Sequence, residues 1–161
     1  MPLLQGVLAD REAWSATGEC SIEKTMSALG TKSAMLIMRE AYYGTTRFDD
    51  FARRVGITKA AAAARLSELV DLGLLTRRPY REPGQRTRDE YVLTEAGIDF
   101  MPVVWAMFRW GQRHLPGRNR LRLTHLDCGA EASVEVRCAK GHPVAPDELG
   151  MELTRRNRHG P

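Results

Sequence analysis

The sequence predicts a mainly α-helical fold that carries small β-hairpins. Apolar residues recur at helical spacing between positions 21 and 73, and a glycine follows the end of each helix expected there. The pair Pro83-Gly84 then separates two short runs of strand-forming residues. Hydrophobic residues make up 43% of the 161 residues and charged residues 27%, so the chain can bury a core and wholesale disorder is excluded.

Four helices are expected in the first half of the chain. They cover approximately residues 21–30, 32–43, 47–55 and 58–73. Ser21 and Thr58 are candidate N-caps of the first and fourth helices, because their hydroxyls can accept a hydrogen bond from the first helical turn. The short connection around Gly56 joins the third helix to the fourth. Two helices joined in this way form a helix-turn-helix.

A β-hairpin and a long helix follow. Residues 75–76 begin one strand, residues 91–93 form the other, and the tip between them is rich in arginine. A helix capped by Thr94 then extends to about His114, with a kink expected at Pro102. Its apolar side chains exceed what one small domain can bury, so we expect this helix to form a dimer interface. The expected interface residues are Val104, Trp105, Phe108 and Trp110.

The order of helices, hairpin and long helix is that of a winged helix-turn-helix DNA-binding domain. We expect this domain at residues 20–115, an N-terminal extension at 1–19 and a C-terminal tail at 116–161. No basic and apolar leader precedes the domain, and the longest apolar run, residues 100–108, is too short for a membrane span. A cytoplasmic location without a membrane partner is therefore expected. The three cysteines, an odd number, favour reduced thiols over a disulfide framework.

Basic residues concentrate in one segment of the chain. Residues 47–88 contain ten Lys and Arg but five Asp and Glu, a net charge of +5, whereas the remainder carries −1 of the total of +4. A local excess of positive charge favours a polyanionic partner such as duplex DNA, because Lys and Arg neutralise phosphates. A basic surface that is merely solvated is the alternative.

Five consecutive alanines occupy positions 60–64 of the fourth expected helix. A helical wheel places Ala62, Leu66 and Leu69 on the core side, and Ala60, Ala64 and Ser67 opposite. Small outward side chains let a helix lie deep in the major groove, where an alanine methyl can contact a thymine methyl. Polar contacts are then left to Thr58, Lys59 and Arg65. Because alanine is favoured in any helix, a run that only fills the helix is the alternative.

The expected DNA contacts come from this recognition helix and from the hairpin. Arginine suits phosphates and narrow minor grooves, which favours the arginines of the hairpin, with a solvated tip as the alternative. The full expected set is Arg47, Thr58, Lys59, Ala60, Ala61, Ala64, Arg65, Arg78, Arg81, Arg86 and Arg88. A symmetric homodimer would place two such sets on half-sites about one helical turn apart.

The tail contains two pairs of metal-ligand residues. They are His125 with Cys128, and Cys138 with His142. Alternating polar and apolar residues around Gly129-Ala130 predict a second hairpin, and thiolates with imidazoles at its turns suit tetrahedral zinc. A zinc ribbon would normally have a cysteine where Gly141 stands, so a degenerate ribbon is expected. A hairpin without metal and with two half-buried cysteines is the preferred interpretation, and zinc is the alternative.

Four motifs make the chain similar to a known family. They are the cysteine ahead of the first helix, RFDDF at 47–51, RLSELVDLGLLTR at 65–77 and YVLTEAG at 91–97. On these motifs the segment from Cys20 to Gly111 resembles the HxlR-type bacterial transcriptional regulators, a branch of the MarR-like winged-helix proteins. The sequence differs from the usual family pattern at Ser33, and at Lys59-Ala60 in the recognition helix. The resemblance implies a homodimeric, sequence-specific DNA-binding regulator, and we expect a repressor rather than an activator.

Cys20 is a candidate redox-sensing residue. It lies just before a helix, where the helix dipole favours the thiolate, and similar family members use a cysteine here to sense oxidants or electrophiles. An oxidant or small-molecule effector is therefore an expected partner. Because buried cysteines are mostly inert, a cysteine that only packs is the preferred interpretation of Cys20.

The sequence contains no recognisable catalytic motif. We find no paired-carboxylate site, phosphate-binding glycine loop or nucleophile elbow, so an enzyme is not expected and no cofactor is required. Two alternatives to a simple repressor stay open. One is a protein-interaction module that keeps the winged-helix scaffold, and the other is a regulator switched by a thiol or a metal through Cys20 or the tail.

Overall fold

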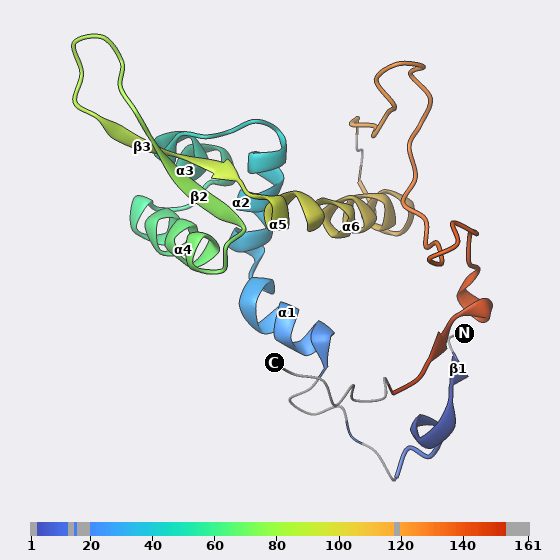
Figure 1. The fold of residues 1–161 in the computed structure, drawn as a ribbon. Helices are drawn as coiled ribbons and strands as arrows, with labels where there is room; N and C mark the ends of the chain where they lie inside the picture. The colour runs from blue at the N-terminus through green and yellow to red at the C-terminus, as the bar shows by residue number, and fades with distance from the viewer. Residues whose placement is uncertain (1–2, 13–14, 16–19, 118–119, 154–161) are drawn as a thin grey trace. The chain divides into compact units, whose positions relative to one another are not determined.

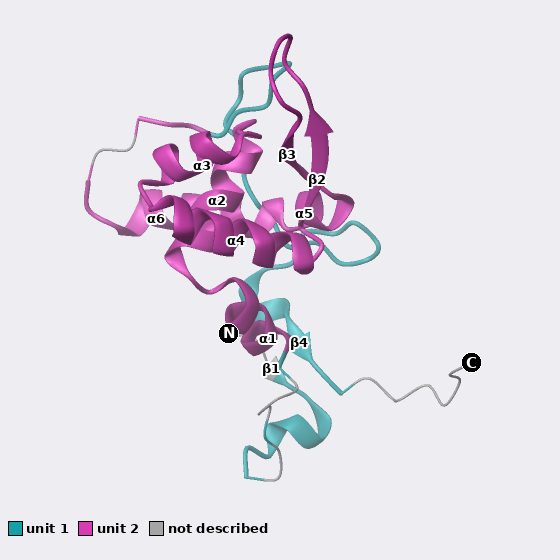
Figure 2. Ribbon diagram, turned by 90° about the vertical axis from the view of Figure 1, so that its left-hand side faces the viewer, with its two compact units in different colours: residues 1–20, 123–161 teal, residues 21–122 magenta. Residues whose placement is uncertain are grey.

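The computed structural model divides the chain into two compact units. It describes residues 3–12, 15, 20–117 and 120–153. One unit contains residues 21–122, and the other combines residues 1–20 with residues 123–161 (Figure 2). The two terminal segments, which sequence analysis places as a separate extension and tail, therefore belong to one unit.

The helical unit begins with four helices. They are α1 (Ser21–Leu29), α2 (Lys32–Tyr42), α3 (Phe48–Val55) and α4 (Lys59–Asp71) (Figure 1). The Thr58 hydroxyl accepts a hydrogen bond from the Ala61 N–H at 3.1 Å, as a capping residue should. Ser21 is itself the first helical residue of α1, and not the residue before it, so the predicted cap is wrong by one position. Between α3 and α4, Gly56 adopts a left-handed conformation with φ of 73°, which lets the chain turn tightly.

The core of this unit lies where α2, α3, α4 and the first hairpin strand meet. Its largest fully buried side chains are Ile37, Met38, Phe51, Leu66, Leu69 and Leu75. On α4, Ala62 is completely buried together with Leu66 and Leu69, which confirms the predicted core stripe. Ala60 and Ala64 are exposed and Ser67 is half-buried. The absence of bulk at Ala62 allows close packing of α4, while the exposed alanines leave its outer surface smooth.

The hairpin consists of β2 (Leu75–Tyr80) and β3 (Arg88–Leu93), paired in antiparallel fashion from Leu75 opposite Leu93 to Tyr80 opposite Arg88. The segment between α2 and α3 joins this sheet, because Arg47 forms an antiparallel bridge with Glu90 and the Tyr91 N–H donates to the Thr46 carbonyl at 2.8 Å. The hairpin is therefore attached to the helices at the entrance to α3. The predicted mainly helical winged helix-turn-helix with a β-hairpin is confirmed.

The long helix expected from Thr94 to His114 is two helices, α5 (Glu95–Asp99) and α6 (Met101–His114). Pro102 occupies the second position of α6, where its missing N–H breaks no helical hydrogen bond. The predicted kink is thus a break at Phe100, which ends one helix and begins the next.

Close packing joins α5 to the rest of the helical unit. The buried Gly97 lies so near the Leu74 carbonyl that an added Cβ would come within 2.2 Å of its oxygen. The Tyr42 hydroxyl donates to the Gly97 carbonyl at 2.7 Å, and burial raises the pKa of Tyr42 to about 12, so the phenol stays protonated as a donor. These contacts fix α5 against α2 and against the turn before β2.

The terminal unit contains little regular structure. A parallel pair of two-residue strands, β1 (Leu3–Leu4) and β4 (Gly150–Met151), joins the beginning of the chain to its end, with short 3-10 helices η1 (Gly6–Ala9) and η2 (Pro146–Glu148). The second hairpin predicted around Gly129-Ala130 is reduced to a tight turn with one bridge, Thr124 to Glu131. Most side chains of this segment are exposed, so the apolar residues of the predicted strands have no core to pack against. A two-stranded hairpin without such a core is not stable.

Candidate nucleic-acid interface

The recognition helix α4 presents a surface of small side chains at its N-terminal half. Ala60, Ala61, Ala63 and Ala64 are all exposed. The predicted polar residues around them are held by neighbouring acids: Lys59 Nζ lies 2.7 Å from Asp49 Oδ1, and Arg65 forms an ion pair with Glu68 one turn later. A DNA phosphate would have to compete with these carboxylates for both cations.

Asp49 occupies the first turn of α3 and lies among basic groups from three elements. Its partners are Lys59 of α4, Arg88 of β3 and Arg53 of α3. The Lys59 ammonium, through its hydrogen bond and its charge, holds the pKa of Asp49 below the usual range. One carboxylate thus links the N-terminus of the recognition helix with the hairpin.

Asp49→Asn is expected to raise the affinity for all DNA sequences. The change removes one negative charge beside the phosphates and releases Lys59, so the slope of log affinity against log salt should steepen by about 0.9. A salt titration of binding to duplexes of scrambled sequence measures this. Asp71→Asn, the same change at the exposed end of α4, is the matched control. Weaker or unchanged binding by the Asp49 variant would contradict a DNA-facing role for this corner.

Two predicted DNA-binding arginines are tied to a buried carboxylate at the base of the hairpin. Arg78 of β2 contacts Glu90 Oε1 through Nε at 2.8 Å and through Nη2 at 2.7 Å. Arg47 Nη1 lies 3.9 Å from Glu90 Oε2, and its guanidinium covers the Tyr80 ring at 3.1 Å from the centroid. Arg78 nevertheless exposes 65% of its side chain, so part of its guanidinium faces solvent.

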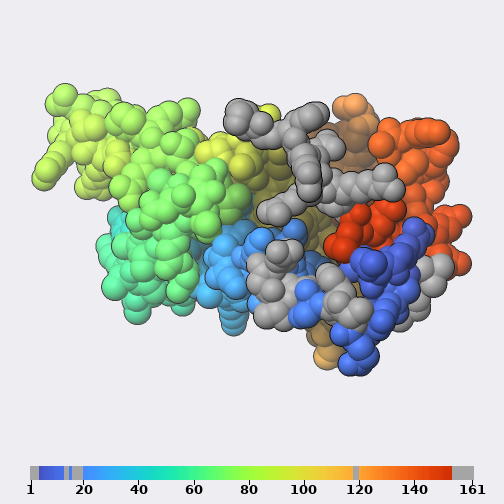
Figure 3. All heavy atoms as spheres, turned by 60° about the horizontal axis from the view of Figure 1, so that its bottom comes forward, coloured from blue at the N-terminus to red at the C-terminus, as the bar shows by residue number. Residues whose placement is uncertain are grey.

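The tip of the hairpin carries the remaining predicted arginines. Arg81 donates from Nε to the Gln85 carbonyl at 3.1 Å, which orders the turn around Gly84. Arg86 and Arg88 are exposed, and the described part of the chain offers neither of them an ion-pair partner within 4.0 Å. The space-filling view shows the light-green hairpin projecting from the helical unit (Figure 3). The exposed guanidinium groups of Arg86 and Arg88 are suited to reaching phosphates or a minor groove.

Sequence reasoning missed Glu90, which contacts Arg78 and Arg47, and Tyr80, which packs against Arg47. In the sequence, Glu90 is one of several charged residues in a polar segment. The signal available in the sequence was its alternation with Asp89 and Tyr91, which places Asp89 and Tyr91 on one side of the strand and Glu90 on the other. An acid on a strand next to basic residues is normally solvated, so burial could not be read from this pattern.

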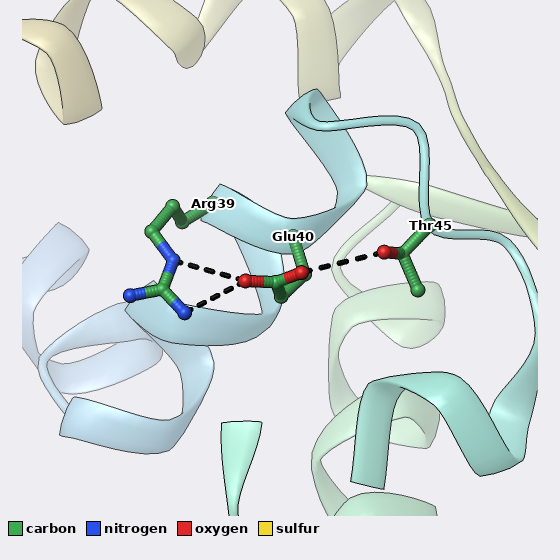
Figure 4. Close-up of polar contacts among 3 residues, drawn as sticks. All are labelled: Arg39, Glu40 and Thr45. Carbon is green, nitrogen blue, oxygen red and sulfur yellow. Dashed lines mark hydrogen bonds and ion pairs between the residues drawn. The ribbon is translucent and has the colours of Figure 1, made fainter. Parts of the chain in front are cut away.

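A second buried carboxylate, Glu40 of α2, fixes the connection into α3. Arg39 Nη2 lies 2.7 Å from Glu40 Oε1, and the Thr45 hydroxyl donates to Oε2 at 3.4 Å (Figure 4). The Thr45 N–H also donates to the Glu40 carbonyl at 3.0 Å. This clamp orients the segment that leads to Arg47.

The predicted dimer residues are divided between two faces of α6. Val104 is buried, Trp105 packs against the rings of Tyr42 and Tyr43, and Phe108 packs edge-on against Trp105. These three therefore pack within the subunit, and of the predicted set Trp110 is the exposed member, at 58%. Three more exposed apolar residues adjoin a groove of about 450 Å³ between α1, α2 and α6: Met26, Val103 and Met107.

The predicted thiol and metal residues lie in the terminal unit. Cys20 is half-buried, while Cys128 and Cys138 are exposed free thiols. His125 Nδ1 lies 3.3 Å from Cys128 Sγ, so the structure brings this pair together. Within residues 3–12, 15, 20–117 and 120–153, no three His, Cys, Asp or Glu side chains converge as metal ligands. The zinc site with His125, Cys128, Cys138 and His142 stays a prediction.

The helix-turn-helix, its β-hairpin wing and the basic residues around them define a winged helix-turn-helix DNA-binding protein. Residues 28–119 match the family of HxlR-like helix-turn-helix proteins, and the chain belongs to this family of transcriptional regulators, which are not enzymes. None of the described helices has the length and apolar character needed to cross a membrane.

Known proteins similar to this chain are also regulators. An uncharacterized HTH-type transcriptional regulator of Mycobacterium tuberculosis is 34% identical over 139 residues, which cover 85% of this chain and 82% of that protein. The crystal structure of PA1607, a candidate transcription factor, superposes with a TM-score of 0.72 at 30% identity, covering 87% of this chain and 97% of that one. The reduced redox regulator HypR superposes with a TM-score of 0.53 at 29% identity, over 58% of this chain and 92% of its own.

Proposed function

We propose that this HTH-type transcriptional regulator is a dimeric repressor that inserts α4 into the major groove and places its wing arginines on the backbone. The observation that carries this proposal is that Asp49 forms an ion pair with Lys59 at 2.7 Å and lines a small pocket together with Arg88, so the start of the recognition helix lies next to the wing strand. The exposed alanines of α4 would give shape complementarity to the groove floor, and the arginines would supply charge. Such a repressor acts in the cytoplasm, where it reaches the chromosome.

The proposed dimer buries an apolar face formed by α1 and α6. We define this face by its exposed residues Ile22, Met26, Val103, Met107 and Trp110. Met26, Val103 and Met107 line one groove, so the two helices contribute to a continuous apolar surface. A second copy of the chain fits this surface because a twofold interface pairs the same patch with itself. Large exposed apolar patches are rare on proteins that remain monomeric.

The test is binding to a labelled duplex from the region upstream of the protein's own gene, titrated with salt and competed with scrambled DNA. Binding that survives scrambled competitor and weakens with salt supports a sequence-specific regulator. Weak binding to the labelled duplex that scrambled DNA abolishes as readily as unlabelled upstream DNA does would favour the protein-interaction module instead.

The similarity to the redox regulator HypR supports a redox switch in this chain, and we propose that its site is the half-buried Cys20. We expect an oxidant to release the wild-type protein from DNA, and Cys20→Ser to abolish that release while leaving affinity under reducing conditions unchanged. DNA retention measured with and without peroxide checks this. Cys138→Ser, at an exposed thiol, is the control. Release that persists in the Cys20 variant would exclude Cys20 as the switch.

A further inference from the structure

Two charged residues are buried in the described part of the chain, Glu40 and Glu90, and both hold the segment between α2 and α3. Glu40 binds Thr45 at the start of this segment. Glu90 faces Thr46 and Arg47 at its end, and Arg78 from the neighbouring strand. The two carboxylates differ in one respect. Both guanidinium groups at Glu90 belong to the predicted DNA surface, whereas the guanidinium at Glu40 belongs to Arg39 of α2.

Glu90 divides its two oxygens between these guanidinium groups. Oε1 accepts from Nε and Nη2 of Arg78, which fixes the plane of that group and leaves its Nη1 donors available. Oε2 faces Arg47, whose Nη1 is buried and has no hydrogen-bond partner in the described structure. Tyr80 supports Arg47 from the other side. An arginine held in this way loses little side-chain entropy when it contacts DNA.

We propose that Glu90 is a positioning residue for DNA recognition, which orients Arg78 and Arg47 and so determines how well the protein distinguishes its operator from other DNA. This inference rests on the proposed function, because it needs a sequence-specific complex. Glu90 acts in two opposing ways. Its negative charge competes with phosphates and weakens binding to any DNA, while its fixed geometry favours the sequence that matches the oriented arginines.

Glu90→Gln separates these two effects, since glutamine keeps the size of the side chain and removes its charge. Affinity for scrambled DNA should rise, and the slope of log affinity against log salt should steepen by about 0.9. The ratio of affinities for the preferred and the scrambled duplex should fall about tenfold, because a well-oriented charged contact discriminates by about that factor. The preferred duplex is obtained by selection from a random library with the full-length wild-type protein.

Glu40→Gln is the matched control, the same change at the other buried carboxylate. Because Glu40 holds Thr45 and contacts no arginine of the predicted DNA surface, this change should lower the affinity ratio less than Glu90→Gln does and should leave the salt slope unchanged. Arg78→Gln, a change at a residue 65% exposed in its side chain, tests the same idea without disturbing the core, and should lower the ratio as Glu90→Gln does. In the double variant the ratio should fall no further than in either single variant, because both changes remove one interaction.

The outcomes separate this inference from the proposed function. A wild-type protein without preference for any selected duplex contradicts the proposed function and the inference with it. A wild-type protein with a clear preference overturns the inference alone if Glu90→Gln or Arg78→Gln keeps the wild-type ratio. Equal losses of ratio in Glu40→Gln and Glu90→Gln would also overturn it, because the ratio would then report general damage to the fold.

Discussion

Replacing Arg86 and Arg88 together with alanine is expected to weaken binding to every DNA sequence by a similar factor. Both residues are exposed on the wing and form no ion pair within 4.0 Å among the described residues, although Asp49 attracts Arg88 at longer range, so DNA need not break a direct ion pair to reach them. Each lost phosphate contact should reduce the salt slope by about 0.9, which gives about 1.8 for the pair. We expect an affinity loss on the order of tenfold to a hundredfold at low salt, which diminishes as salt is added.

Electrophoretic or fluorescence titrations at several salt concentrations measure both quantities. Arg113→Ala removes an exposed arginine from the end of α6, outside the predicted DNA surface, and should leave affinity and slope unchanged. An unchanged slope in the wing variant would mean that the wing does not contact the backbone. A loss confined to one preferred sequence would instead assign the two arginines to base readout in a groove.

The elements of the helical unit could be predicted because their signals are local. Thr58 caps α4, Gly56 ends α3 in a left-handed turn, and Leu66 and Leu69 recur at the spacing of a buried stripe. Each signal depends on a few neighbouring residues and survives without knowledge of the tertiary structure. The same holds for the wing, which the pair Pro83-Gly84 marks as a turn.

Features that depend on tertiary contacts could not be predicted in the same way. The sequence shows many apolar residues on α6, but which of them face α2 depends on the break at Phe100. Val104 and Trp105 therefore pack within the subunit, and Val103 and Met107 are exposed. The role of Glu90 depends on a partner twelve residues away on the opposite strand and on Arg47 of a third segment. The pairing of β1 with β4 joins opposite ends of the chain, and two-residue strands have no detectable pattern.

Replacing Met107 with aspartate is expected to dissociate the proposed dimer. Met107 is 53% exposed in the single chain and lines the groove with Met26 and Val103, at the centre of the apolar face. In a twofold interface each substitution occurs twice, so two carboxylates would be buried without partners. At a cost of about 2 kcal/mol each, the dissociation constant should rise about a thousandfold.

Sedimentation at several protein concentrations measures the change in assembly. Leu72→Asp makes a similar change at an exposed apolar residue at the end of α4, away from the apolar face, and should leave the dimer intact. Binding to a duplex with two half-sites should fall with dimerisation, because a monomer engages one half-site and loses the second contact set. Binding to a single half-site should hardly change. A Met107→Asp protein that remains dimeric would place the interface elsewhere. If this dimeric variant has also lost DNA binding, Met107 affects DNA binding without holding the two subunits together.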